Sequence, residues 1–257
     1  METRKALEDK AVRLMLLNHA VEGASSSELE ADVNLIVGQL LALLLKHQNS
    51  TTYFNTAVGS KELQTIYDRL YQLADEYAER VTDELIEAYI QASETFSTED
   101  LGSEVYSLEE ELNATRSDLL DEMGVEDLQA SFEQIVREAI ANIQTSIRYG
   151  VALGNFNTVV FEQINKSIKR LTFRFQLITR TLTSKVTNQA LFNKYLEVGI
   201  SYIKWETRPE ATPSGTCSVC EGHSHGGANF DGIYSILSMP IMPAHEHCAC
   251  VAVPVLG

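Results

Sequence analysis

Apolar residues recur at steps of three and four over most of the first 200 positions, which is the period of an amphipathic helix. Ser27 and Glu30 form a capping-box pattern and predict the start of a helix. Its apolar face carries Leu29, Val33, Ile36, Val37, Leu40, Leu41 and Leu44. A second helix is predicted after Ser60 and should run on through Leu85 to Ile90. Residues 93–128 are acidic and interrupted by glycine, so we expect short helices and loops there.

Two further helices follow this interruption. The first has its apolar face at Phe132, Ile135, Val136, Ala139, Ile140, Ile143 and Ile147, with Gly150 as its predicted end. After Gly154, apolar residues alternate steps of four and three in a short heptad-like seam, at Ile164, Ile168, Leu171, Phe175, Ile178 and Leu182. So short a seam favours packing within one chain over an intermolecular coiled coil. Three threonines near 180 predict a weak end to this helix, and a further short helix should end at Gly199.

The pattern changes at residue 200. Residues 200–205 are aromatic and β-branched and predict a strand, and 233–237 are strand-like as well. All four cysteines and all five prolines lie beyond this point. A unit this small needs a metal or disulfides to fold. The sequence therefore predicts a mainly α fold: an acidic helical region (1–128), a helical core (129–199), together forming an elongated helical body, and a small β-containing C-terminal module (200–257).

The cysteines of this module have the spacing of a zinc site. Cys217-x-x-Cys220 is followed by His245-x-x-Cys248-x-Cys250. Zn²⁺ favours thiolate and imidazole ligands, and four protein ligands make a closed structural site. We expect one structural Zn²⁺ held by Cys217, Cys220, His245 and either Cys248 or Cys250. The longer spacing from His245 slightly favours Cys250.

Other chemistry in the module is not indicated. Disulfides are disfavoured because no signal peptide is recognised, and the protein should be made in a reducing cytoplasm. His223, His225 and His247 lie in a Gly-rich setting and are expected to be solvated. The chain shows no phosphate-binding loop and no nucleophile–base pair, which argues against an enzyme. The apolar run Leu35–Leu45 is too short for a membrane span.

Charge is distributed unevenly. The chain has 20 Lys and Arg against 36 Asp and Glu, a net charge of -16, which makes it a poor general binder of nucleic acid. Residues 163–196 nevertheless contain no acid and seven cations: Lys166, Lys169, Arg170, Arg174, Arg180, Lys185 and Lys194. This basic segment faces either the chain's own acidic helices or an acidic partner, and the sequence leaves both readings open.

Three stretches together resemble a known family. Tyr202–Thr207, Cys217-Ser-Val-Cys220 and Pro243–Cys250 are similar to the C-terminal signature of the Mu F-like phage head morphogenesis proteins. Thr179–Leu182 also matches a helical element of that family. The resemblance covers roughly residues 165–255. Glu246, Ala249 and Leu182 depart from the family's usual proline, arginine and glutamate, and its Asp-x-Arg before the first cysteine is absent.

The resemblance implies a minor capsid protein of a tailed phage. Such a protein is made in the host cytoplasm, associates with the portal protein during head assembly and stays in the virion, inside the head near the portal vertex. Lys166, Lys169, Arg170 and Arg174 would then contact other head proteins or packaged DNA. A nucleic-acid-binding protein and a zinc-supported nuclease using one of the module's histidines are the alternatives.

Overall fold

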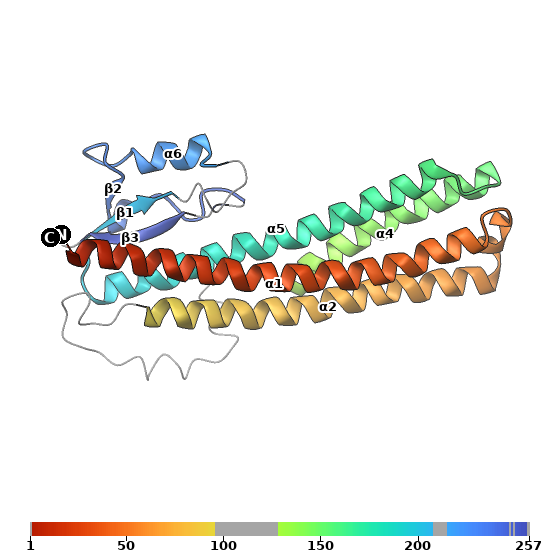
Figure 1. The fold of residues 1–257 in the computed structure, drawn as a ribbon, viewed down its shortest axis with the longest axis horizontal. Helices are drawn as coiled ribbons and strands as arrows, with labels where there is room; N and C mark the ends of the chain where they lie inside the picture. Colours follow the sequence, from red (N-terminus) through yellow and green to blue (C-terminus); the bar gives the residue numbers. More distant parts are fainter. Residues whose placement is uncertain (1, 96–127, 208–214, 247, 249, 256–257) are drawn as a thin grey trace. The chain divides into compact units, whose positions relative to one another are not determined.

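The computed structural model describes residues 2–95, 128–207, 215–246, 248 and 250–255 (Figure 1). The long helices are α1 (Glu2–Lys46), α2 (Ala57–Glu94), α4 (Leu128–Leu153) and α5 (Thr158–Glu197), and the short ones are η1 (Thr51–Asn55), α6 (Ser218–Ser224) and η4 (Ile236–Ser238). The strands are β1 (Tyr202–Glu206), β2 (Ile233–Ser235) and β3 (Val251–Val255). This confirms the mainly α class with a β-containing C-terminal module. The short helices and loops expected within 96–127 lie outside the described residues.

The chain divides into two compact units. Unit 1 comprises Met1–Gly23, Asp83–Glu126 and Leu177–Gly257, and unit 2 comprises Ala24–Thr82 and Asp127–Gln176. The three-segment division that the sequence suggests remains a prediction. Among the described helices, none combines the length and the apolar character that crossing a bilayer requires.

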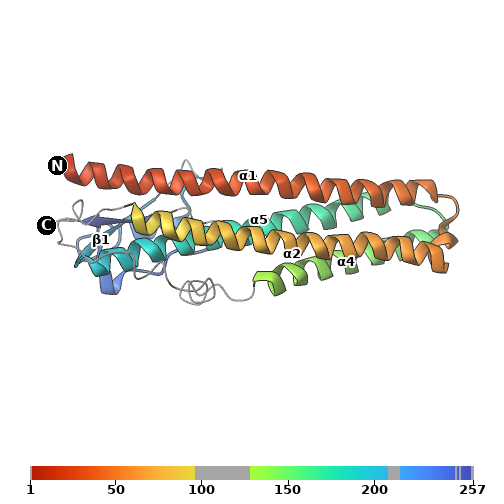
Figure 2. The same cartoon turned by 90° about the horizontal axis from the view of Figure 1, so that it is seen from below.

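Unit 2 consists of two helical hairpins, α1–α2 and α4–α5, whose segments lie side by side (Figures 1 and 2). Their predicted apolar faces are buried, including the seam residues Ile164, Ile168, Leu171 and Phe175, so this part of the seam packs within the chain. Among the buried rings, that of Phe132 lies 4.4 Å from that of Phe175 and 5.3 Å from that of Tyr77. The turns of the two hairpins also touch, since the Phe156 N–H donates to the Gln48 carbonyl at 3.3 Å.

The first two helices do not begin where the serines suggested. Helix α1 runs through Ser27 without a break, because serine costs little in a helix interior that is flanked by helical turns on both sides. Helix α2 starts at Ala57, three residues before Ser60. Thr56 caps it, with its hydroxyl oxygen accepting the Gly59 N–H at 3.1 Å. The continuation of this helix through Ile90 is confirmed, since α2 reaches Glu94.

The predicted ends of the later helices also need correction. Helix α4 passes Gly150 and stops at Leu153, followed by Gly154 with φ +74°, a conformation that suits glycine. Gly150 instead gives room to the Phe156 ring, which lies where a Cβ would be. Helix α5 continues through its threonines as one element to Glu197, because Thr181 and Thr183 donate their hydroxyls to carbonyls four residues back. Its end before Gly199 is as predicted.

The module's sheet packs on α5 within unit 1. Strand β1 is central and antiparallel to both neighbours in the order β2-β1-β3, with Ile203 opposite Tyr234 and Pro254. The predicted strand at 200–205 is therefore β1, shifted slightly, while β3 was not anticipated. Asn188 and Tyr195 on α5 hydrogen-bond the backbone of β3, and this contact fixes the cysteine at the strand's start.

Candidate metal centre

The first half of the site is built by helix α6. Cys217 is its N-cap, and the Cys217 sulfur accepts the Cys220 N–H at 3.4 Å. A cysteine can take this role because a helix N-terminus leaves backbone N–H groups without intrahelical partners. The spacing of three residues then puts both sulfurs on the first turn. Cys217 is exposed and Cys220 is buried, so the pair spans the boundary between solvent and the module's core.

His245 closes on this pair from the segment before β3. Its Nε2 lies 3.0 Å from the sulfur of Cys217 and 3.0 Å from that of Cys220. Its Nδ1 is 2.5 Å from the carbonyl oxygen of Glu246, which can only accept a hydrogen bond. The Nδ1–H therefore donates to that carbonyl, and Nε2 presents its lone pair to the sulfurs. A backbone carbonyl that orients the second ring nitrogen is the usual support of a metal-binding histidine.

Two further cysteines complete the cluster. The sulfur of Cys248 is 3.6 Å from that of Cys220, close to the roughly 3.8 Å between two thiolates on one tetrahedral zinc. The ligand atoms form two groups, Cys217–Cys220–His245 and Cys220–Cys248–Cys250, each with all its atoms within 4.8 Å of one another. Cys220 belongs to both groups. All five predicted ligand residues thus gather in one place, which we call the Cys/His cluster, and the cluster can hold a metal ion.

The thiols of the cluster differ in pKa. Backbone hydrogen bonding from Cys220 lowers the pKa of Cys217, while burial raises that of Cys220 to about 12. A hydrogen bond from the Cys250 thiol lowers the pKa of Cys248 to about 5, with support from backbone N–H groups, and the same bond raises the pKa of Cys250.

The charge on His245 responds to the same groups. Burial opposes its protonation, but the Glu246 carbonyl and the thiolates of Cys248 and Cys217 outweigh burial and raise the pKa of His245 above 6.5. A divalent cation placed among these groups would replace the protons that they hold in its absence, since metal ligands bind in their deprotonated forms.

The cluster sits against the module's small core. Trp205 on β1 is fully buried and packs with Cys220, Cys248 and Cys250, and the half-buried Tyr234, Met239, Met242 and Ala244 lie around them. Trp205 lies beside His223, with 4.6 Å between the ring centroids. Three of the candidate metal ligands, Cys220, Cys248 and Cys250, therefore belong to the hydrophobic core of the module.

The remaining histidines lie elsewhere. His223 contacts Trp205 and is only half-buried, and exposed His225 has its Nδ1 2.9 Å from the Glu221 carbonyl oxygen. Neither belongs to the two ligand groups. His247 lies outside the described residues.

Sequence reasoning missed Asn188. Its side-chain Nδ2 donates to the Cys250 carbonyl at 3.1 Å, and its Oδ1 accepts the Ala252 N–H at 3.0 Å. The signal available was a polar residue between the apolar positions Val186 and Ala190 of the helix, which suggests a buried amide that needs backbone partners.

Comparison of the whole chain with family models, curated proteins and solved structures finds no match.

Proposed function

We propose that this chain is a minor capsid protein of a tailed phage, associated with the portal, and that one structural Zn²⁺ holds its C-terminal module together. One observation carries the proposal. The stretches that resemble the family signature are far apart in sequence, yet Trp205, Cys220 and Cys248 meet in one buried cluster. Motif residues that converge in this way act as one structural unit, which is what a shared zinc-stapled module requires.

The donor set supports a structural role for the metal rather than a catalytic one. A catalytic zinc keeps a coordination position for water, whereas Cys217, Cys220, His245 and a further cysteine fill all four. The fifth candidate adds one more thiol to the same space. The packing against Trp205 also makes this a site that holds segments together.

We infer that Cys248 is the fourth ligand, which reverses the slight preference from spacing. Its sulfur lies 3.6 Å from that of Cys220, and its charge acts on His245 together with that of Cys217. The Cys250 sulfur lies within 4.8 Å of the sulfurs of Cys220 and Cys248, and the Cys250 carbonyl is tied to Asn188. In this assignment Cys250 does not bind the metal but helps to orient Cys248 as an outer-shell residue.

The direct test is co-expression of the full chain with the portal protein encoded in the same phage genome. We expect the two proteins to co-purify and this chain to be found in assembled heads. A chain that stays apart from portal and heads would refute the proposal. Nuclease activity with added metal, or salt-dependent DNA binding with no portal association, would instead favour one of the two alternative functions.

A further inference from the structure

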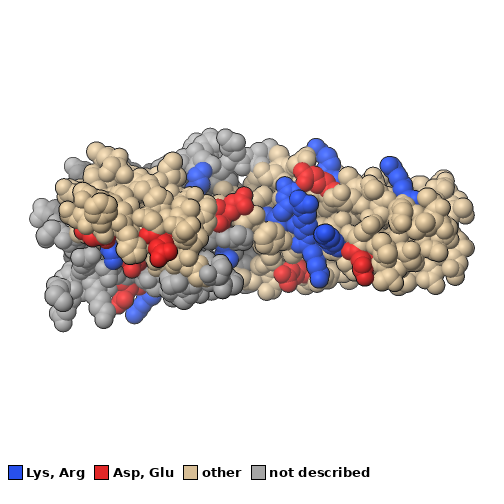
Figure 3. Space-filling view, turned by 90° about the horizontal axis from the view of Figure 1, so that it is seen from above, with Lys and Arg blue, Asp and Glu red and all other residues tan. Residues whose placement is uncertain are grey.

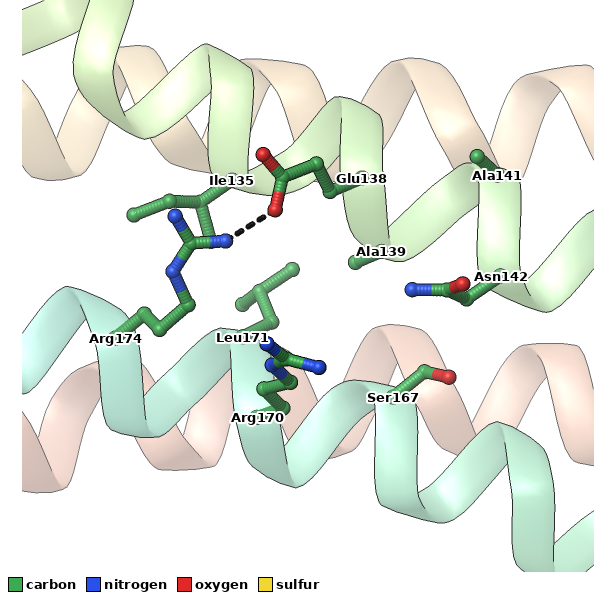
Figure 4. A pocket seen from close by; sticks show the side chains of 9 residues that line it. All are labelled: Ile135, Glu138, Ala139, Ala141, Asn142, Ser167, Arg170, Leu171 and Arg174. Carbon is green, nitrogen blue, oxygen red and sulfur yellow. Dashed lines mark hydrogen bonds and ion pairs between the residues drawn. The ribbon is translucent and has the colours of Figure 1, made fainter.

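The α4–α5 hairpin of unit 2 carries a ladder of facing polar side chains. The helices run antiparallel, so a step of four residues forward along α4 and four back along α5 leads to the next rung. On the first rung, the Arg174 guanidinium pairs with the Glu138 carboxylate (Figure 4). On the next rung, α5 carries Arg170 and α4 carries Asn142, which is an amide and not a second carboxylate (Figure 4).

A pocket opens at this second rung. It has a volume of about 230 Å³, and its walls come from both helices. Figure 4 shows Arg170 and the Asn142 amide turned toward the space between the helices. Among the residues that the structure describes, no hydrogen-bond acceptor meets the exposed guanidinium of Arg170, which only contributes to the field at Glu138. The Ser167 hydroxyl is committed to the Gln163 carbonyl at 3.0 Å. Arg174 and Glu138 also line the pocket and are paired with each other, so Arg170 and the Asn142 amide are the lining donors outside that ion pair.

We propose that this pocket binds a carboxylate side chain from an acidic partner protein, with Arg170 and the Asn142 amide as its hydrogen-bond donors. The neighbouring ion pair shows the same chemistry, because Arg174 binds the Glu138 carboxylate between the same two helices. The apolar walls formed by Ile135, Ala139 and Leu171 suit the methylene groups of a glutamate stem.

The surroundings favour a protein over nucleic acid. Figure 3 shows basic side chains gathered on this face with acidic ones beside them. A surface of mixed sign complements a protein with a specific charge pattern, whereas it repels part of a phosphate backbone that carries a charge about every 1.7 Å. Lys166 and Lys169 are exposed on neighbouring turns and can strengthen the attraction without entering the pocket.

The inference goes beyond the phage assignment and does not depend on it. The pocket lies wholly within unit 2, and the Cys/His cluster lies in unit 1. If the acidic ligand binds and the portal does not co-purify, the pocket stands and the proposed function fails. If the portal co-purifies and the acidic peptide does not bind, the proposed ligand of the pocket is refuted and the portal contact lies on another surface.

The test uses the full chain and a fluorescein-labelled peptide of about ten glutamates, with fluorescence anisotropy at low and high salt. We expect Arg170→Gln to weaken binding about fivefold to tenfold, as expected for one exposed charge-assisted contact. Arg148→Gln removes the same charge from an exposed site on α4 outside this pocket and should change affinity less than twofold.

The more specific variant is Asn142→Asp. It keeps every cation but gives Arg170 a carboxylate from its own chain, so the peptide should bind as weakly as it does to Arg170→Gln. Thr145→Asp adds the same charge on α4 outside the pocket lining and should have a smaller effect. Circular dichroism must show that all variants fold. Three results would each overturn the proposal: no binding of the peptide by the wild type, binding by Asn142→Asp as tight as by the wild type, or tighter binding of a DNA duplex than of the peptide.

Discussion

Asn188 holds Cys250 in place by donating its side-chain amide to the Cys250 carbonyl at 3.1 Å. The same side chain accepts the Ala252 N–H at 3.0 Å, so one buried residue of α5 satisfies two backbone groups of the chain around β3. These bonds hold the backbone at Cys250 and at the start of β3. Asn188 should for this reason contribute to the stability of the module.

Replacing Asn188 with leucine should destabilise unit 1 by roughly 2–5 kcal/mol. The substitution keeps the number and branching of the side-chain heavy atoms but leaves a buried carbonyl and a buried N–H without partners, each of which costs about 1–3 kcal/mol. Urea unfolding followed by circular dichroism measures the change. Gln189→Ala is the matched control on α5, since within the described part of the chain its amide bonds only the Asn193 side chain, and it should cost well under 1 kcal/mol. Equal losses for both variants would contradict the role of Asn188.

Metal analysis of the purified protein should give one equivalent of zinc. Cys217→Ser and Cys248→Ser should each lower it to a small fraction, because either change removes a ligand. Cys250→Ser should retain most of the metal but bind it more weakly, since outer-shell contacts typically change affinity by about 10- to 100-fold. Less than half an equivalent of zinc in the wild type would count against the site. A greater loss of zinc in Cys250→Ser than in Cys248→Ser would make Cys250 the fourth ligand in place of Cys248.

Chelation should unfold the C-terminal module while the long helices stay intact. Metal-binding energy is folding energy in a module of this size, whereas the helices bury apolar faces of their own. Trp205 is the only tryptophan and is fully buried against the cluster, so its emission should shift to longer wavelength with little change in far-UV circular dichroism. Protease should then cut after about residue 200. A parallel loss of helix would show that the module and the helices unfold together.

Gly150→Ala should destabilise unit 2 by about 1–3 kcal/mol. The new methyl group would overlap the ring of buried Phe156, and the turn between α4 and α5 would have to shift. Gly38→Ala is the control in α1, because a Cβ there would have no atom of the described residues within 4 Å beyond its own helix backbone and chain neighbours. It should stabilise by up to about 1 kcal/mol through helix propensity. Thermal melts of the two variants should therefore move in opposite directions.

The Glu138–Arg174 pair predicts a small dependence of stability on pH. Hydrogen bonds from Gln134 and then Arg174 lower the pKa of Glu138 in the folded state below its ordinary value of 4.5. A lowered folded pKa means that the contribution is complete above 4.5 and disappears as pH falls through the lowered value. Wild type should therefore exceed Glu138→Gln in melting temperature at pH 7, and the difference should vanish in strong acid. A difference that persists at pH 2 would show another cause.

Helix periodicity predicted the apolar faces well, because burial on one side of a helix leaves a regular signal. It predicted the ends poorly. Serine, threonine and glycine are only weak helix breakers, and packing decided the matter at Gly150 and along the threonines of α5. The candidate metal ligands were recognisable because cysteine and histidine are rare and their spacing is restricted. Asn188 was not recognisable in this way, since its partners are backbone atoms about sixty residues away.

The cluster joins segments that are distant along the chain, since Cys220 and His245 are 25 residues apart. A bound ion there acts as a reversible cross-link, closing a loop whose closure entropy otherwise opposes folding. Mass action then makes the folded fraction of the module depend on the concentration of free metal, with each tenfold rise above the dissociation constant adding about 1.4 kcal/mol. The metal supply at the time of synthesis would thus determine how much of the protein has a folded C-terminal module.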